Sequence, residues 1–106
     1  MTVEMIAGIP VDMNEDGFLI DPNQWTEEVA VELARRERIV PLTDRHWTVI
    51  HFMREQFEAK GTGPNVRLLG KTSGIEEKEL YQLFPKSPVK LAAKISGIPM
   101  PGTLSE

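Results

Sequence analysis

The segment from Leu80 to Glu106 constrains the fold most, because its prolines and glycines set where a helix can begin and end. Ser87-Pro88 is typical of an N-cap followed by the first helical residue. Gly97 occupies the place where a left-handed residue would end that helix. Pro99 and Pro101 keep the residues before them extended. We therefore expect a short helix followed by an extended C-terminal arm over residues 97–106, which would present itself to a partner.

The rest of the chain predicts a mainly α fold with an N-terminal β-hairpin. Residues 2–20 hold short β-branched segments around Ala7-Gly8 and a turn signal at residues 14–17. Apolar residues at helical spacing then predict a small orthogonal bundle of about five helices within residues 24–96. Expected helices before the last one cover residues 24–37, 44–59, 64–71 and 75–84.

Several local features of the bundle follow from its sequence. Residues 44–59 carry apolar side chains on more than one face, which predicts the central helix. Ser73 and Glu76 have the spacing of a capping box for the helix after them. Trp25 and Trp47 are expected to anchor the core. With 106 residues, the chain is expected to form one domain made of the hairpin, the bundle and the arm.

Motifs along nearly the whole chain match one family pattern. The C-terminal match is the most specific, and it comprises Phe84, Pro85, Pro88, Lys94, Gly97, Pro99 and Pro101. Earlier matches are His46, Trp47, Val49, Phe52, Arg54, Pro64, Val66, Arg67 and Leu69. These positions resemble the DsrC/TusE/DsvC family of sulfur-relay proteins, which includes the gamma subunit of dissimilatory sulfite reductase. Departures from the pattern are Ser87, Ser96 and Ile98.

The most consequential departure is the lack of cysteine anywhere in the chain. The resemblance places the family's penultimate cysteine at Leu104 and the second cysteine of two-cysteine members at Ala93. Without a thiol, the chain cannot form a disulfide or carry a persulfide. We expect it not to be an enzyme and to need no cofactor.

The resemblance also implies a partner-binding arm, with sulfite reductase-like enzymes or sulfurtransferases as partners. Its candidate residues are Lys94, Gly97, Ile98, Pro99, Met100, Pro101 and Leu104. Arg54, Arg67 and Lys90 coincide with basic family positions and form a possible anion-binding or partner surface. The simpler interpretation of these basic residues is surface ion pairing or solvation.

The sequence leaves two other classes of function open. Residues 64–84 have the outline of a helix-turn-helix, which predicts a DNA-binding regulator. Against it, the second helix begins with carboxylates, and DNA affinity depends on cationic contacts. The other alternative is a structural subunit of a larger sulfur enzyme.

Other sites and compartments find little support. His51 and Glu55 share a helix face, but no third metal ligand is evident. No convergent pair of carboxylates predicts acid–base catalysis. No apolar run is long enough to span a membrane, and we expect a cytoplasmic protein. We therefore expect a cysteine-less homologue with a non-catalytic, partner-binding or regulatory function in sulfur metabolism.

Overall fold

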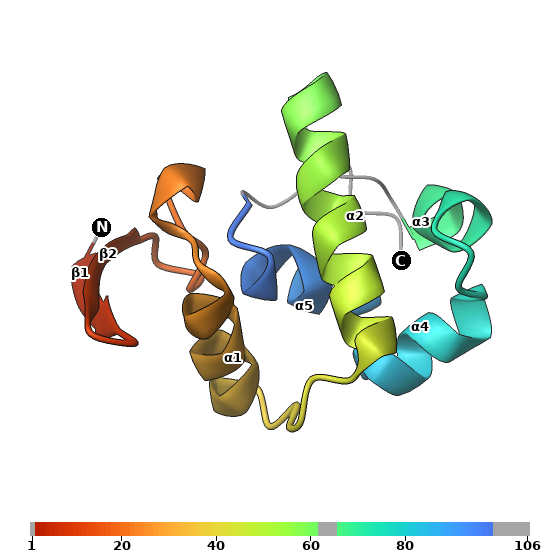
Figure 1. The fold of residues 1–106 in the computed structure, drawn as a ribbon, viewed down its shortest axis with the longest axis horizontal. Coiled ribbons are helices and arrows are strands. Elements are labelled where there is room, and N and C mark those ends of the chain that lie inside the picture. The colour runs from red at the N-terminus through yellow and green to blue at the C-terminus, as the bar shows by residue number, and fades with distance from the viewer. Residues whose placement is uncertain (1, 62–65, 99–106) are drawn as a thin grey trace.

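A computed structural model describes residues 2–61 and 66–98. In these residues an N-terminal hairpin is followed along the chain by five α-helices (Figure 1). The elements follow the order β1 (Thr2–Ile6), β2 (Ile9–Met13), the 3-10 helix η1 (Pro22–Gln24), α1 (Glu27–Arg36), α2 (Asp44–Lys60), α3 (Val66–Thr72), α4 (Glu77–Leu83) and α5 (Pro88–Ile95). The predicted mainly α fold with a hairpin is confirmed. Among the described residues, no helix combines the length and apolarity that crossing a membrane requires.

The hairpin forms because Ala7 and Gly8 both adopt positive φ, at 52° and 78°. Two such residues give the tight turn whose twist matches that of paired strands. The turn sets an antiparallel register with Thr2 opposite Met13 and Ile6 opposite Ile9. Ile6, Val11 and Met13 are consequently buried on one face of the hairpin, which lies beside α1 in Figure 1.

The first helix begins three residues later than predicted. Asp21 caps η1, and Thr26 Oγ1 then accepts a hydrogen bond from the Val29 amide at 3.1 Å, so α1 starts at Glu27. Two capping residues five apart divide the segment into a 3-10 turn and a helix. Trp25 therefore lies in the connection between the two rather than in α1.

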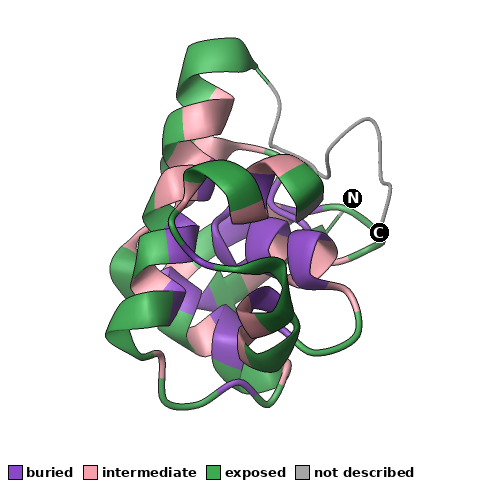
Figure 2. Ribbon diagram, turned by 90° about the vertical axis from the view of Figure 1, so that its right-hand side faces the viewer, coloured by how far each residue is buried: buried purple, intermediate pink, exposed green. Residues whose placement is uncertain are grey.

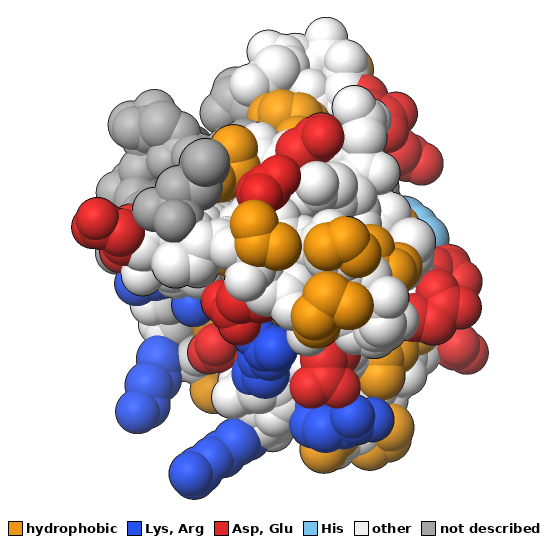
Figure 3. Space-filling view, turned by 90° about the vertical axis from the view of Figure 1, so that its left-hand side faces the viewer, with side chains coloured by type: hydrophobic (Ala, Val, Ile, Leu, Met, Phe, Trp, Pro, Cys, Tyr) orange, Lys and Arg blue, Asp and Glu red, His pale blue; other side chains and the backbone are white. Residues whose placement is uncertain are grey.

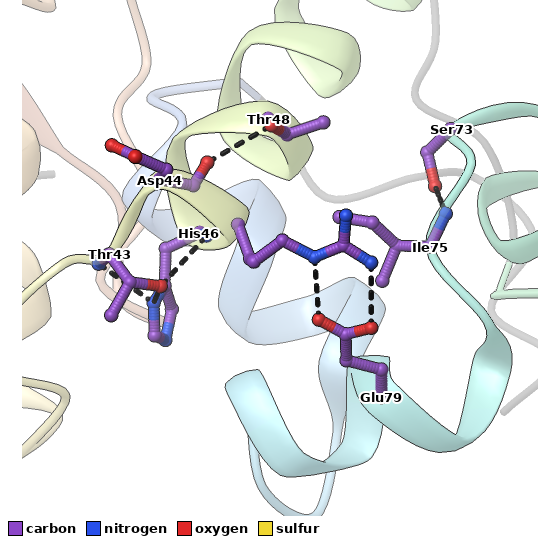
Figure 4. Close-up of polar contacts among 8 residues, drawn as sticks. Thr43, Asp44, His46, Thr48, Ser73, Ile75 and Glu79 are labelled. Carbon is purple, nitrogen blue, oxygen red and sulfur yellow. Dashed lines mark hydrogen bonds and ion pairs between the residues drawn. The ribbon is translucent and has the colours of Figure 1, made fainter.

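His46 completes the cap at the start of α2. The Thr43 amide donates to His46 Nδ1 at 3.0 Å, and the opposite ring nitrogen, Nε2, lies 3.0 Å from the Leu83 carbonyl oxygen. A backbone N–H can only donate, so Nδ1 carries no proton and Nε2 donates to Leu83. The neutral ring thus joins the start of α2, drawn in Figure 4, to the end of α4. Burial lowers the pKa of His46, although the bond to Leu83 opposes the shift.

The predicted capping box at Ser73 and Glu76 does not form. Gly74 has φ +83°, and Ser73 Oγ instead accepts from the Ile75 amide at 3.2 Å. This local turn uses up the hydroxyl, and α4 begins at Glu77 without a side-chain cap. Further along α4, Glu79 accepts two hydrogen bonds from Arg45 at 2.7 and 2.8 Å, shown as dashed lines in Figure 4.

The central helix is α5, not the α2 segment that the sequence indicated. Val89, Ala92, Ala93 and Ile95 of α5 are buried, and this helix packs against each of α1, α2, α3 and α4. Its small alanines let the neighbouring helices approach closely. In α2, by contrast, the buried apolar residues Val49, Ile50 and Met53 lie along one side. Figure 2 shows the same division, with buried residues on the inward sides of the helices.

Candidate functional site

The root of the arm, residues 95–98, is fixed by the way α5 ends. The Ile98 amide donates back to the Ala93 carbonyl at 3.2 Å, and the Gly97 amide donates to Lys94 at 3.3 Å. Gly97 adopts φ +70°, as the predicted left-handed end of the helix requires. Ser87-Pro88 starts the helix as predicted, although the Ser87 side chain makes no capping hydrogen bond.

Trp25 holds this root from the other end of the sequence. Its indole Nε1 donates to the Ile95 carbonyl at 2.8 Å. A Cβ atom at Gly97 would lie 2.4 Å from Trp25 Cδ1, well inside van der Waals contact. Two independent requirements therefore favour glycine at position 97. The backbone has a positive φ, and the Trp25 indole occupies the space where a Cβ atom would lie.

Arg54 on α2 adds a second anchor. Its guanidinium donates from Nη1 to the Ser96 carbonyl at 2.8 Å and from Nη2 to the Pro22 carbonyl at 3.2 Å. The same group lies 4.3 Å above the Trp25 ring, a cation–π contact. Burial lowers the pKa of Arg54, with Glu58 opposing the shift. The interpretation of Arg54 as a surface ion-pairing or solvated residue is therefore wrong.

Ile98 is the last described residue of the arm, and it is fully buried. It lines a groove of about 280 Å³ together with Pro22, Asn23, Arg54, Phe57 and Glu58. The last described residues of the chain thus hold an anchored position beside Arg54. The other predicted arm residues, Pro99, Met100, Pro101 and Leu104, lie outside the described residues. Their function as a partner-binding arm stays a prediction.

Lys94, also assigned to the arm from sequence, points elsewhere. Its Nζ lies 3.6 Å from Glu37 Oε2 and 5.5 Å from the centre of the Phe18 ring, and only 16% of its side chain is exposed. Lys94 therefore connects α5 to Glu37 at the end of α1 and to Phe18, which follows the hairpin. Lys94 lines a different groove from the one that holds Ile98.

The three basic residues proposed as one surface line no common groove within the described part of the chain. Arg54 lines the groove at the arm root, Lys90 lines the one that contains Lys94, and Arg67 is exposed on α3. Sequence spacing gave no signal of this separation, because the residues belong to three helices. Whether any of them contacts a partner stays a prediction.

Within the described residues, neither the possible metal ligands His51 and Glu55 nor the family's cysteine position at Ala93 belongs to a reactive centre. His51 Nε2 lies 3.6 Å from Glu27 Oε2, and its ring stacks on Trp47 at 5.7 Å between centroids. No group of three possible metal ligands occurs in residues 2–61 and 66–98. Ala93 is fully buried inside α5, and Leu104 lies beyond the described range.

Comparison with known proteins identifies the family. The family model described as DsrC like protein matches residues 5–103, which is most of the chain. This chain belongs to the DsrC-like family. Among its curated relatives, a Sulfurtransferase TusE homolog of Haemophilus influenzae is 38% identical over 103 residues, covering 91% of this chain and 94% of the relative. The gamma subunit of dissimilatory-type sulfite reductase from Nitratidesulfovibrio vulgaris is 35% identical over 94 residues, covering 89% and 90%.

Solved structures of DsrC-like proteins have the same fold. A crystal structure titled dissimilatory sulfite reductase I, DsrI, matches with a TM-score of 0.88 at 35% identity and covers 96% of this chain and 98% of its own. The oxidized gamma subunit, DsrC, from Archaeoglobus fulgidus matches with a TM-score of 0.82, again at 35% identity and with the same coverage. The predicted family is confirmed, and this DsrC-like chain has no cysteine.

Proposed function

We propose that this DsrC-like protein is a non-catalytic binding protein of sulfur metabolism. Its arm would dock on a sulfite reductase-like enzyme or a sulfurtransferase without carrying sulfur. Relatives named as a sulfurtransferase and as a sulfite reductase subunit support the class of partner. Competition with a thiol-bearing relative for the same docking place would make such a protein regulatory.

One observation carries the proposal: the arm root is anchored although the chain has no thiol to deliver. Trp25, Arg54 and Gly97 hold residues 95–98 through two side-chain hydrogen bonds to the root and one close contact. Fixing an exit direction in advance lowers the entropy cost of binding a partner. An anchored root is thus consistent with an arm that binds, whereas sulfur transfer requires a thiolate.

The chemical half of the proposal has its own test. The chain should gain no sulfur atom when incubated with a persulfide donor, as measured by intact-protein mass spectrometry. A reversible gain of one sulfur atom that dithiothreitol removes would show a transfer chemistry independent of cysteine and would contradict the non-catalytic function.

The binding half is tested by truncation at the position that the structure indicates. Because Ile98 is buried, a chain ending at Ile98 removes residues 99–106 and keeps every described contact of the root. The full chain should bind the purified sulfite reductase or sulfurtransferase of its source organism, and the truncated chain should not.

A version with residues 99–106 in scrambled order is the matched control for length and composition. It should also fail to bind, with circular dichroism unchanged in all three proteins. Equal binding by the full, truncated and scrambled chains would remove the arm from the proposal.

A further inference from the structure

A second groove, unrelated to the arm root, gathers positive charge. It has a volume of about 450 Å³ and lies where the end of α1, the connection at residues 85–87 and α5 meet. Four of its lining residues are cationic and one is acidic: Arg38, Lys86, Lys90, Lys94 and Glu37. The whole chain carries a net charge of −4. The residues that line the groove are therefore mainly positive, although the protein as a whole is negatively charged.

The single carboxylate among the lining residues pairs with Lys94 and does not balance the charges of Arg38 and Lys86. Glu37 already pairs with Lys94 at 3.6 Å. Within residues 2–61 and 66–98, neither Arg38 nor Lys86 has an ion-pair partner, and both are exposed. Figure 3 shows Lys and Arg side chains in the lower part of one face, with Asp and Glu side chains next to some of them. Cations crowded together repel one another unless an anion lies between them.

The backbone angles of two residues in the groove are a second, independent observation. Among the described residues, three besides glycine have positive φ, namely Ala7, Arg38 at 63° and Lys86 at 74°. Two of the three are cations, and both line this groove. Glycine adopts such angles without the steric penalty that a side chain incurs. Residues held in this region cluster at binding sites, where the side chain is needed despite the strain.

Each of the two strained positions has a defined local geometry. At Arg38, the Ile39 amide donates to Ala34 at 2.8 Å and the Arg38 amide to Arg35 at 3.0 Å, the helix ending in which glycine is usual. At Lys86, the Ser87 amide donates to Pro85 at 2.9 Å, which makes a strained three-residue turn. Stability alone would favour glycine at both places, so the cationic side chains point to a ligand.

We propose that this groove binds a small polyvalent oxyanion of the sulfate or phosphate type. The planar guanidinium of Arg38 can donate two parallel hydrogen bonds to such an anion, and the ammonium groups of Lys86 and Lys90 contribute charge. Pro85, Ile39 and Leu91 form the apolar part of the wall. The proposal is independent of the function assigned to the arm.

The test is a titration of isotope-labelled protein with sodium sulfate and with sodium phosphate at constant ionic strength, followed by backbone amide NMR. The expected result is saturable shifts confined to residues 37–39 and 85–91. Arg38→Gly and Lys86→Gly should each weaken binding at least about tenfold, the effect of losing one charge-assisted hydrogen bond. Both variants should melt at the same temperature as the parent or higher, because glycine relieves the strain.

Two matched variants distinguish the loss of a specific cation of the groove from the general effects of relieving backbone strain and of removing a positive charge. Ala7→Gly relieves the same kind of strain at a residue that does not line the groove, and Arg67→Gln removes an exposed cation from α3. Neither should change the affinity for sulfate. The proposal is overturned if shifts do not saturate, if Arg67→Gln weakens binding as much as Arg38→Gly, or if only an acidic peptide and neither inorganic anion produces the shifts.

Discussion

Gly97 and Trp25 lie in contact across seventy-two positions of sequence, with no space for a side chain at position 97. Gly97→Ala should therefore destabilise the fold by about 2–4 kcal/mol, combining a forced positive φ with an overpacked contact. Gly74→Ala is the matched control, since Gly74 has φ +83° but open space around it. It should cost only about 1 kcal/mol. Urea unfolding measures both, and equal losses would contradict the steric part of the argument.

Arg54→Gln should destabilise the protein by about 2 kcal/mol, because the carbonyls of Ser96 and Pro22 lose a charged donor at a half-buried place. Arg35→Gln offers a comparison, since Arg35 is 63% exposed and forms one ion pair with Glu32. Its loss should stay below about 0.5 kcal/mol. Thermal unfolding of the two variants checks the difference, and a similar small effect from both would show that Arg54 does not anchor the root.

Stability should fall as the pH drops below about 6.5. The pKa of His46 is lower in the folded chain than in the unfolded chain, so the unfolded state binds the proton more readily. The stabilising contribution is complete above the unfolded pKa and is lost as the pH falls towards the folded pKa. Urea unfolding between pH 5 and pH 7.5 measures this slope.

His46→Gln provides the control for that slope. Glutamine can still accept from the Thr43 amide but does not titrate, so the variant should be less stable at neutral pH and nearly flat between pH 5 and pH 7. An unchanged slope in the variant would assign the pH dependence to other groups.

A cysteine restored at one family position should be unreactive in the native protein. Ala93 is fully buried in α5, so the thiol of Ala93→Cys should react with an alkylating reagent only after unfolding. Ala59→Cys, at an exposed position of α2, should react at once under the same conditions. Mass spectrometry over time separates the two, and fast alkylation at position 93 would show that α5 opens from the bundle.

Local sequence signals predicted the elements whose ends are set by local chemistry. The turn at Ala7-Gly8, the start of α5 at Pro88 and its end at Gly97 all depend on backbone preferences of one or two residues, and the structure confirms them. The start of α1 was predicted three residues too early, because Asp21 caps only η1 and Thr26 caps α1. Two good caps close together cannot be ranked from sequence alone.

At the candidate site, the partners of the key side chains could not be predicted, because they are distant in sequence. Trp25 packs against the core as expected, but it lies in a connection rather than on a helix, and its indole binds the end of α5. Arg54 resembled a surface cation, yet it is positioned by carbonyls from residues 22 and 96. The place of His46 beside the start of α2 favours a capping residue, and the structure confirms this, but its second contact, with the Leu83 carbonyl at the end of α4, left no signal in the sequence. Each case depends on partners that only the folded chain brings together.

The hydrogen bond from Trp25 to Ile95 spans seventy residues, which gives it a meaning for the order of folding. Contacts between distant parts of a chain form late, because the intervening loop must close first. On the ribosome, the indole emerges long before its acceptor and has to wait for the C-terminal helix. Residues 95–98 therefore reach their anchored position only when the two ends of the bundle have met, so under the proposed docking function only fully folded chains would present the arm to a partner.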